Sequence, residues 1–207
     1  MTSTGQPSLG DDTTVDQLVP RVSWEEYLRL EAPDGLRFEF DDGRLLVSPT
    51  GIVSHNLLIA VLLELFGEYE EKTRGRHAVA FPPQSYFMPP GERDYQPDVS
   101  VITDARKDRP LPDRIVGPPD IAVEVLSPST VRRDRGLKAA RYFAEGTREY
   151  WMFDAEARTV EIHRRGRKGW VSARLDANGR YRTPLLPGFA MSVATVWRRL
   201  DRKLRRK

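Results

Sequence analysis

The chain has 207 residues, of which 39% are hydrophobic and 30% charged, so its length suits one domain of ordinary size. Its 4 Trp, 7 Tyr and 8 Phe exclude a chain that is disordered throughout. The absence of cysteine excludes disulfides, thiolate metal sites and cysteine nucleophiles. No apolar run approaches the roughly 18 residues of a membrane span, and no secretory signal begins the chain. We therefore expect a cytoplasmic protein without membrane contact.

The net charge of +3 is unevenly distributed along the chain. Residues 198–207 contain seven Arg or Lys and one Asp, which gives this segment +6 and the remaining 197 residues −3. Such a basic end can hold a nucleic-acid backbone without reading its sequence. It can equally be the solvated end of a helix, and the sequence leaves both readings open.

Three segments follow from composition and periodicity. Residues 1–20 contain no basic residue and no apolar periodicity, which predicts a disordered leader. Residues 21–197 are predicted to form one domain, and 198–207 a basic C-terminal helix end. The domain begins with a short helix, because Ser23 and Glu26 have the spacing of a capping box.

The predicted elements then alternate between strand and helix. Apolar and charged residues alternate through Leu36–Phe40, and Asp41-Asp42-Gly43 turns the chain back, so a hairpin is expected. Helical spacing predicts helices over 52–71, from Thr130 to Glu145, and from Val193 onward. Strands are predicted at 77–81, 84–88, 98–102, 121–126, 149–154, 159–164 and 169–175. This order indicates an α/β fold (α+β, with a mixed sheet) and helices packed on the sheet.

Two carboxylates interrupt apolar strands. Asp98 starts one strand, and Glu124 stands in the middle of Ile121–Leu126. A charged carboxylate in so apolar a strand is costly unless it is paired. Its partner can be a buried Arg, a proton or a metal ion. Two carboxylates on adjacent strands provide the oxygen ligands that Mg²⁺ prefers, and Mg²⁺ can activate water and neutralise charge on a phosphodiester.

The order of motifs resembles the PD-(D/E)XK nuclease superfamily and, within it, the Uma-type family of restriction endonucleases. The resemblance spans about residues 22–197. It rests on Phe38–Leu45, His55, Gln96–Val101, Pro118–Thr130, and the group Asp134, Gly136, Lys138, Tyr142, Gly146 and Glu149-Tyr150-Trp151. The resemblance implies a restriction-endonuclease-like core flanked by hairpins and helices. It also implies an endodeoxyribonuclease that requires Mg²⁺, for which Mn²⁺ can substitute.

The resemblance implies a set of site residues, with one departure from the superfamily pattern. Asp98 and Glu124 would hold the metal. The superfamily places a Lys two residues after the Glu, but here that position is Leu126. Lys138 on the following helix would replace it, sharing a face with Asp134 and Tyr142. A solvent-facing helical Lys is the alternative.

Three further residues belong to this expected site. Glu39 would lie beside the metal as a third ligand or an orienting group, unless it forms a cross-strand pair with a residue such as Arg44. His55 would contact phosphate or act as an accessory acid or base, unless it is a simple histidine of the first helical turn. Gln96 is the weakest candidate for the same cleft.

The sequence therefore favours Mg²⁺-dependent hydrolysis of DNA, with a homodimer as an arrangement suited to double-strand cleavage. A non-catalytic nucleic-acid-binding or regulatory protein on the same fold is the first alternative, since fold does not fix function. A structural protein whose buried carboxylates merely pair with Arg is the second.

Overall fold

The computed structural model describes residues 21–75, 78–88, 92–103 and 115–205. The N-terminal part contains α1 (Trp24–Tyr27) and the hairpin of β1 (Leu36–Asp41) and β2 (Arg44–Pro49). The capping box is present, because Ser23 and Glu26 exchange side-chain to backbone hydrogen bonds. Asp42 and Gly43 both have positive φ, the conformation that a two-residue hairpin turn requires.

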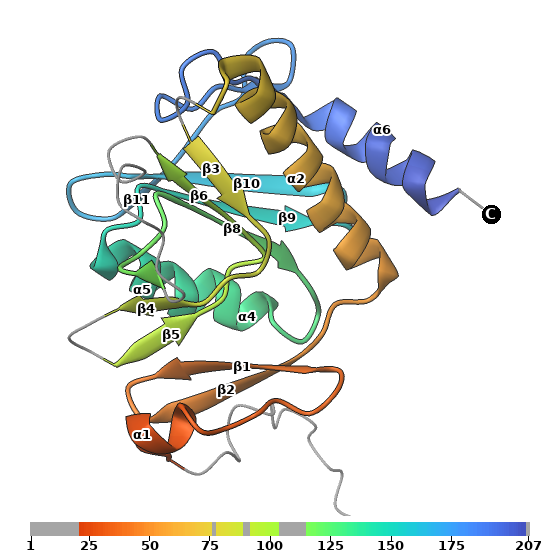
Figure 1. The fold of residues 1–207 in the computed structure, drawn as a ribbon. Coiled ribbons are helices and arrows are strands. Elements are labelled where there is room, and N and C mark those ends of the chain that lie inside the picture. The colour runs from red at the N-terminus through yellow and green to blue at the C-terminus, as the bar shows by residue number, and fades with distance from the viewer. Residues whose placement is uncertain (1–20, 76–77, 89–91, 104–114, 206–207) are drawn as a thin grey trace, which may run out of the picture.

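The hairpin belongs to a five-stranded sheet with the order β2-β1-β5-β4-β7. Its other members are the short strands β4 (Tyr86–Met88), β5 (Arg93–Tyr95) and β7 (Ile115–Val116). Strand β1 pairs antiparallel with β5, which joins the hairpin to the rest of the molecule. In Figure 1 this sheet lies below the larger one, with α1 at its outer edge.

The second sheet has six strands in the order β11-β10-β9-β8-β6-β3. They are β3 (Ala78–Phe81), β6 (Val99–Thr103), β8 (Ile121–Leu126), β9 (Glu149–Asp154), β10 (Thr159–Arg165) and β11 (Trp170–Ser172). Neighbours are antiparallel except β8 and β9, which are parallel. The chain crosses between these two through α4 (Val131–Arg133), a π-helical turn (Asp134–Lys138) and α5 (Ala139–Glu145).

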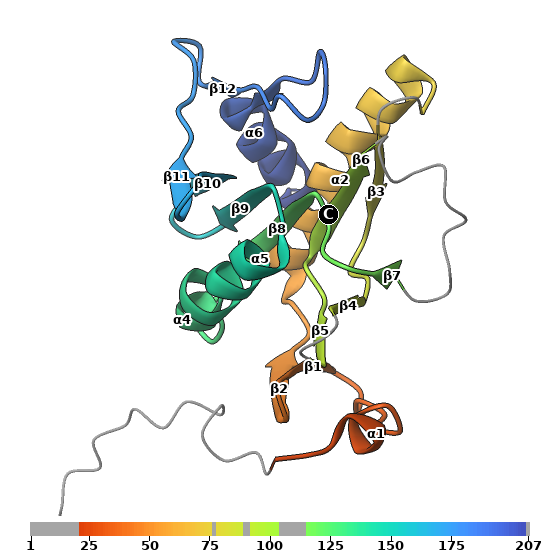
Figure 2. The same cartoon turned by 90° about the vertical axis from the view of Figure 1, so that its left-hand side faces the viewer.

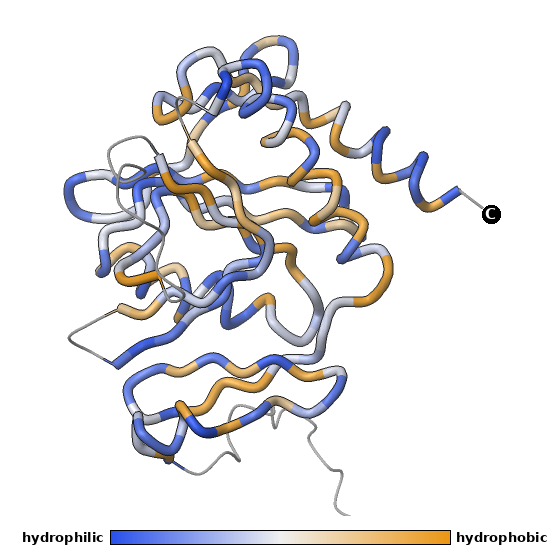
Figure 3. The backbone as a smooth tube through the Cα atoms, viewed as in Figure 1, coloured by the Kyte–Doolittle hydropathy of each residue, from blue (hydrophilic) through white to orange (hydrophobic). Residues whose placement is uncertain are grey.

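Helices cover both faces of the six-stranded sheet (Figure 2). On one face, α2 (Val53–Thr73) and α6 (Val193–Leu204) pack against apolar side chains such as Val123 and Trp151. On the other face, α5 packs against a second cluster that includes Ala122 and Tyr150. Figure 3 accordingly shows hydrophobic colour along the central strands and α2, while the end of α6 is mostly hydrophilic.

Most predicted elements are confirmed, and the fold is the expected mixed one. The strand over 121–126 and that over 149–154 match β8 and β9. The sequence missed β5, β7 and the two-stranded sheet of β12 (Arg180–Tyr181) and β13 (Met191–Ser192). These strands have only two or three residues, too few for a period-two pattern to appear.

Three further expectations concern the two ends of the chain and membrane-spanning helices. The predicted leader 1–20 lies outside the described residues. Helix α6 runs unbroken across residue 197, where the basic end was expected to begin, and Leu200 beyond it is buried in the core. Within the described ranges, no helix is long and apolar enough to cross a membrane.

Candidate active site

Strands β6 and β8 bring the two predicted carboxylates together. In their antiparallel register Val99 pairs with Val123, so the same register places Asp98 opposite Glu124. Directly opposed residues of an antiparallel pair share one face of the sheet. The two strands are further joined at this point by the carboxylate of Asp98, whose Oδ2 accepts a 2.8 Å hydrogen bond from the Val125 amide.

The π-helical turn places the Lys138 ammonium within hydrogen-bond distance of Glu124. The Lys138 ammonium donates a 2.9 Å hydrogen bond to Glu124 Oε1 and lies 3.9 Å from Asp134 Oδ1. Tyr142, four residues further on, donates to the same Glu124 oxygen at 3.3 Å. The shared face of Asp134, Lys138 and Tyr142 is therefore confirmed. Single π-helical turns are frequent at functional sites, and this one carries both Asp134 and Lys138.

Glu39 approaches the same ammonium from the hairpin. Its Oε1 lies 2.9 Å from Lys138 Nζ and also accepts a 2.7 Å hydrogen bond from the backbone amide of Gln96. Glu39 alternates with the apolar Phe38 and Phe40, but it is 0% exposed, because the five-stranded sheet packs this face of β1 against the body. The cross-strand pair with Arg44 is wrong, since Arg44 pairs in register with Asp41.

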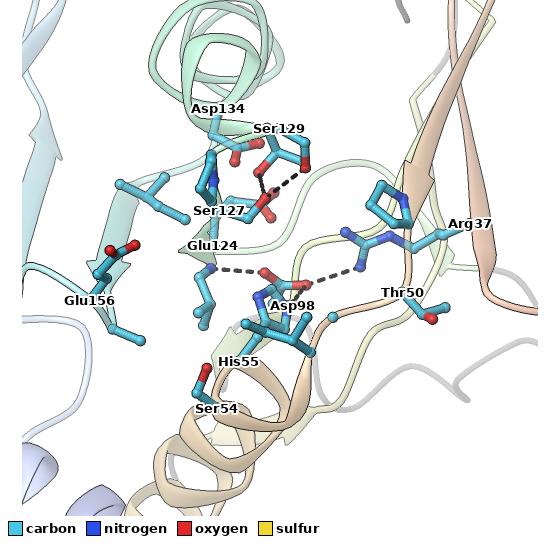
Figure 4. A pocket seen from close by; sticks show the side chains of 18 residues that line it. Arg37, Thr50, Ser54, His55, Asp98, Glu124, Ser127, Ser129, Asp134 and Glu156 are labelled. Carbon is cyan, nitrogen blue, oxygen red and sulfur yellow. Dashed lines mark hydrogen bonds and ion pairs between the residues drawn. The ribbon is translucent and has the colours of Figure 1, made fainter.

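Asp98 has two partners of its own, an arginine and a histidine. Arg37 Nη1 lies 3.0 Å from Asp98 Oδ1, and His55 Nε2 lies 3.4 Å from the same oxygen. His55 occupies the first turn of α2, and its Nδ1 is buried without a hydrogen-bond partner among the described residues. Figure 4 shows the Asp98 carboxylate between the side chains of Arg37 and His55.

These residues border a pocket of about 280 Å³. Asp98, Glu124, Arg37 and His55 form one part of its lining (Figure 4). Hydroxyl-bearing residues of the turn after β8 contribute another part, namely Ser127, Ser129 and Thr130. Glu39 and Lys138 do not belong to this lining; both are at most 1% exposed and lie behind Glu124.

The two pocket carboxylates differ in their electrostatics. Burial raises the pKa of Glu124, and the carboxylates of Asp98, Asp134 and Glu39 add to this rise. The charge of Lys138 opposes them, and the resulting pKa is about 8. Burial also acts to raise the pKa of Asp98, but His55 and Arg37 outweigh it and lower that pKa to about 2. Asp98 is thus a firmly ionised carboxylate. The positive charge around Glu124 is too small to offset its burial and the neighbouring carboxylates, so its pKa stays raised.

The structure excludes one alternative and corrects one expectation. Lys138 is not a solvent-facing helical residue, because it is buried between Glu39 and Glu124. Gln96 does not point into the cleft, since its Nε2 donates to the carbonyl of Phe38 and the residue lines a neighbouring pocket.

Sequence reasoning missed Arg37 and the hydroxyl-bearing turn. Arg37 stands two residues before Glu39, on the same face of a two-residue period, and that spacing is the signal that could have identified it. No site role was predicted for Ser127, Ser129 and Thr130, because Ser129 and Thr130 fit the cap of the following helix.

The donor set fits a hard divalent cation such as Mg²⁺. Within the described ranges no three His, Asp or Glu side chains gather around one point suited to a metal ion. Mg²⁺ needs fewer, because it usually keeps several waters and binds one or two carboxylates together with substrate phosphate. The raised pKa of Glu124 indicates a lack of positive charge at this carboxylate. Glu39 differs, because Lys138, Arg37 and Arg133 outweigh its burial and lower its pKa. Its buried Oε2 has no hydrogen-bond partner among the described residues. Asp98 and Glu124 would hold the ion, and Glu39 as a third ligand stays a prediction.

The fold has a counterpart among solved structures. The chain superposes with a TM-score of 0.72 on a crystal structure described as a "putative nuclease belonging to DUF820" from Anabaena variabilis. The two are 18% identical, and the match covers 86% of this chain and 99% of the other. At this identity the likeness shows the fold alone, a mixed α+β fold.

The sequence then identifies the family. Residues 24–194 match the Uma2 family, described as "Putative restriction endonuclease", and the chain belongs to this family. A relative from Synechocystis sp., named "Uncharacterized protein slr1290", is 26% identical over 189 residues. That match covers 87% of this chain and 94% of the relative.

Proposed function

We propose that this protein is an endonuclease that hydrolyses phosphodiester bonds of DNA with Mg²⁺ held by Asp98 and Glu124. One observation carries the proposal: two opposed carboxylates of β6 and β8 line one pocket, and the second has too little positive charge around it. Membership of the Uma2 family supports the reaction class.

The bound ion would polarise the scissile phosphate and activate water for attack on phosphorus. Asp98 is the ligand with permanent charge, since Arg37 and His55 keep its pKa low. Glu124 completes the pair, and its position is fixed by hydrogen bonds from Lys138 and Tyr142.

Lys138 acts in this proposal through Glu124. Burial acts to lower its pKa, but Glu124 and Glu39 outweigh burial and raise it above the ordinary value. A lysine held protonated in this way cannot accept a proton from water at neutral pH. Its role is to fix and partly neutralise the two glutamates, which makes it a positioning residue.

Arg37 and the hydroxyl-bearing turn offer groups for the substrate. A guanidinium can pair with a phosphate as well as with a carboxylate. Arg37 lines the pocket, and its Nε is buried without a partner in the described part of the chain. The hydroxyls of Ser127, Ser129 and Thr130 lie in the same lining and can donate to phosphate oxygens.

Cleavage of supercoiled and linear DNA in Mg²⁺ or Mn²⁺, with chelator as the control, tests the proposal. Wild type should cut only with the ion, and Asp98→Asn should not cut. DNA binding without cleavage, unchanged by chelator and by Asp98→Asn, would instead favour a non-catalytic nucleic-acid-binding protein on this fold.

A further inference from the structure

The faces of helix α6 differ in what their side chains contact. Val196 and Leu200, four residues apart, are buried in the core beside α2. Arg199 and Lys203, also four apart, form ion pairs with Glu68 and Glu64 of α2. These two pairs show that part of the positive charge in the C-terminal segment is already neutralised within the molecule.

A third face carries positive charge that is not neutralised in this way. Arg198, Arg202 and Arg205 are exposed and follow one another at spacings of four and three, which places them on one side of the helix. Arg198 donates a hydrogen bond to the Thr195 hydroxyl, and within the described residues none of the three arginines forms an ion pair. We call these three residues the basic stripe.

The basic stripe borders a groove on the surface. The groove is lined by Ala194, Trp197, Asp201 and the three arginines of the stripe. Asp201, its acidic member, is paired with Arg158 at 2.6 Å. The groove therefore presents mainly positive charge to solvent.

The basic stripe is connected to the candidate active site through one turn. Arg158, which binds Asp201 of α6, ends the turn between β9 and β10. Ala155 and Glu156, at the start of the same turn, line the pocket with Asp98 and Glu124. Figure 1 shows α6 alongside α2, whose first turn carries the pocket residue His55.

We propose that the basic stripe is a docking surface for the phosphate backbone of double-stranded DNA that extends beyond the candidate active site. This inference rests on the proposed function and adds a second, metal-independent contact to it. Residues 1–197 sum to −3, which is the charge of Asp11, Asp12 and Asp16. Residues 21–197 are therefore neutral overall, and the net positive charge of the chain lies in the C-terminal segment, where attraction of a polyanion is strongest. From Arg198 to Arg205 the helix rises about 10 Å, the rise of about three base pairs.

The test measures binding of a short DNA duplex in chelator, so that cleavage and metal binding play no part. The variant is Arg198→Gln, Arg202→Gln and Arg205→Gln combined. The matched control removes three exposed cations near β11, as Arg167→Gln, Lys168→Gln and Arg174→Gln combined. Both variants lower the net charge by the same amount, and both should keep the melting temperature of wild type.

The stripe variant should lose affinity for all DNA sequences alike, with a salt slope reduced by up to about 2.7 for three phosphate contacts. Between 50 and 200 mM salt, wild type should then lose roughly 40-fold more affinity than the stripe variant. The control variant should keep the wild-type slope.

An unchanged slope in the stripe variant, or an equal loss in the control, would overturn the proposal. Loss of binding to anionic lipid vesicles with DNA affinity unchanged would overturn it too. If the protein shows the expected salt slopes but never cuts DNA, the proposed function is refuted. The basic stripe is then still supported as a docking surface for DNA.

Discussion

Two clusters of charged side chains connect the hairpin to the body of the molecule, and they are balanced differently. In the first, Asp41 lies 2.9 Å from Arg141 and 3.3 Å from Arg93. The same two arginines bind Asp42 at 2.7 and 2.8 Å. In the second, the single ammonium of Lys138 lies within 4 Å of three carboxylates, those of Glu39, Glu124 and Asp134.

The difference separates a structural ion-pair network from a candidate metal site. Each aspartate of the first cluster contacts two guanidinium groups, so the fold itself supplies the compensating charge. Glu124 of the second cluster has a raised pKa and borders a pocket, so it needs a proton or a cation from outside. The alternative of carboxylates that merely pair with Arg describes the Asp41–Asp42 cluster, and it also holds for Asp98, which pairs with Arg37. It does not describe Glu124, whose cationic partner is Lys138.

The largest expected effect is on DNA cleavage. Glu124→Gln keeps the shape of the side chain but removes the charge that would hold the ion, so the rate should fall by on the order of 10²–10³-fold or more. Asp41→Asn, the matched change in the structural cluster, should leave the rate per folded molecule near wild type. Equal losses in the two variants would show that the clusters do not differ in function.

A second contrast concerns the cations. Lys138→Met leaves three carboxylates buried without their ammonium, which should lower the free energy of unfolding by about 3–5 kcal/mol in metal-free protein. Arg141→Met should cost about 1 kcal/mol or less, because Arg141 is partly exposed and Arg93 still binds both aspartates. Urea denaturation measures both values.

The control for Lys138 is the double variant Lys138→Met with Glu39→Gln. It removes one of the uncompensated charges and should recover part of the lost stability. A Lys138→Met protein as stable as Arg141→Met would mean that the ammonium does not compensate the carboxylates.

A third contrast is the dependence of stability on pH. Folding raises the pKa of Glu124 from 4.5 to about 8, so the folded state binds a proton that the unfolded state releases. Stability of metal-free protein should therefore fall as pH rises from about 4.5 to about 8, and Glu124→Gln should remove this fall.

The pKa shift of Asp98 has the opposite effect on the pH dependence of stability. Folding lowers its pKa from 3.8 to about 2, so its contribution to stability is present above about pH 4 and is lost as pH falls toward 2. Melting temperatures across pH for wild type, Asp98→Asn and Glu124→Gln should separate the two effects. A wild-type profile that rises between pH 4.5 and 8, and does so equally in Glu124→Gln, would contradict the assignment for Glu124.

The sequence predicted those parts of the fold that have long, periodic elements. The hairpin, α2, β8, β9 and α5 have enough residues for their spacing to be recognised. The π-helical turn could not be predicted, because helical spacing of apolar residues does not distinguish one wider turn from regular α-helix.

The site was predicted in its members but not in their arrangement. Asp98, Glu124 and Lys138 were found from motif order, yet the burial of Lys138 depends on Glu39 reaching it from a distant hairpin. Arg37 was not predicted as a site residue, because its partner Asp98 is 61 residues away in sequence. Pairing between segments so far apart depends on tertiary packing, which local patterns do not encode.

Thermal unfolding with and without Mg²⁺ or Mn²⁺ tests the central claim most directly. An ion that binds the folded state alone stabilises it by about 2.7 kcal/mol at one hundred times its dissociation constant. Wild type and Asp41→Asn should show this gain, while Asp98→Asn and Glu124→Gln should not. The same ion-dependent gain in wild type and in both site variants would contradict a metal site at Asp98 and Glu124.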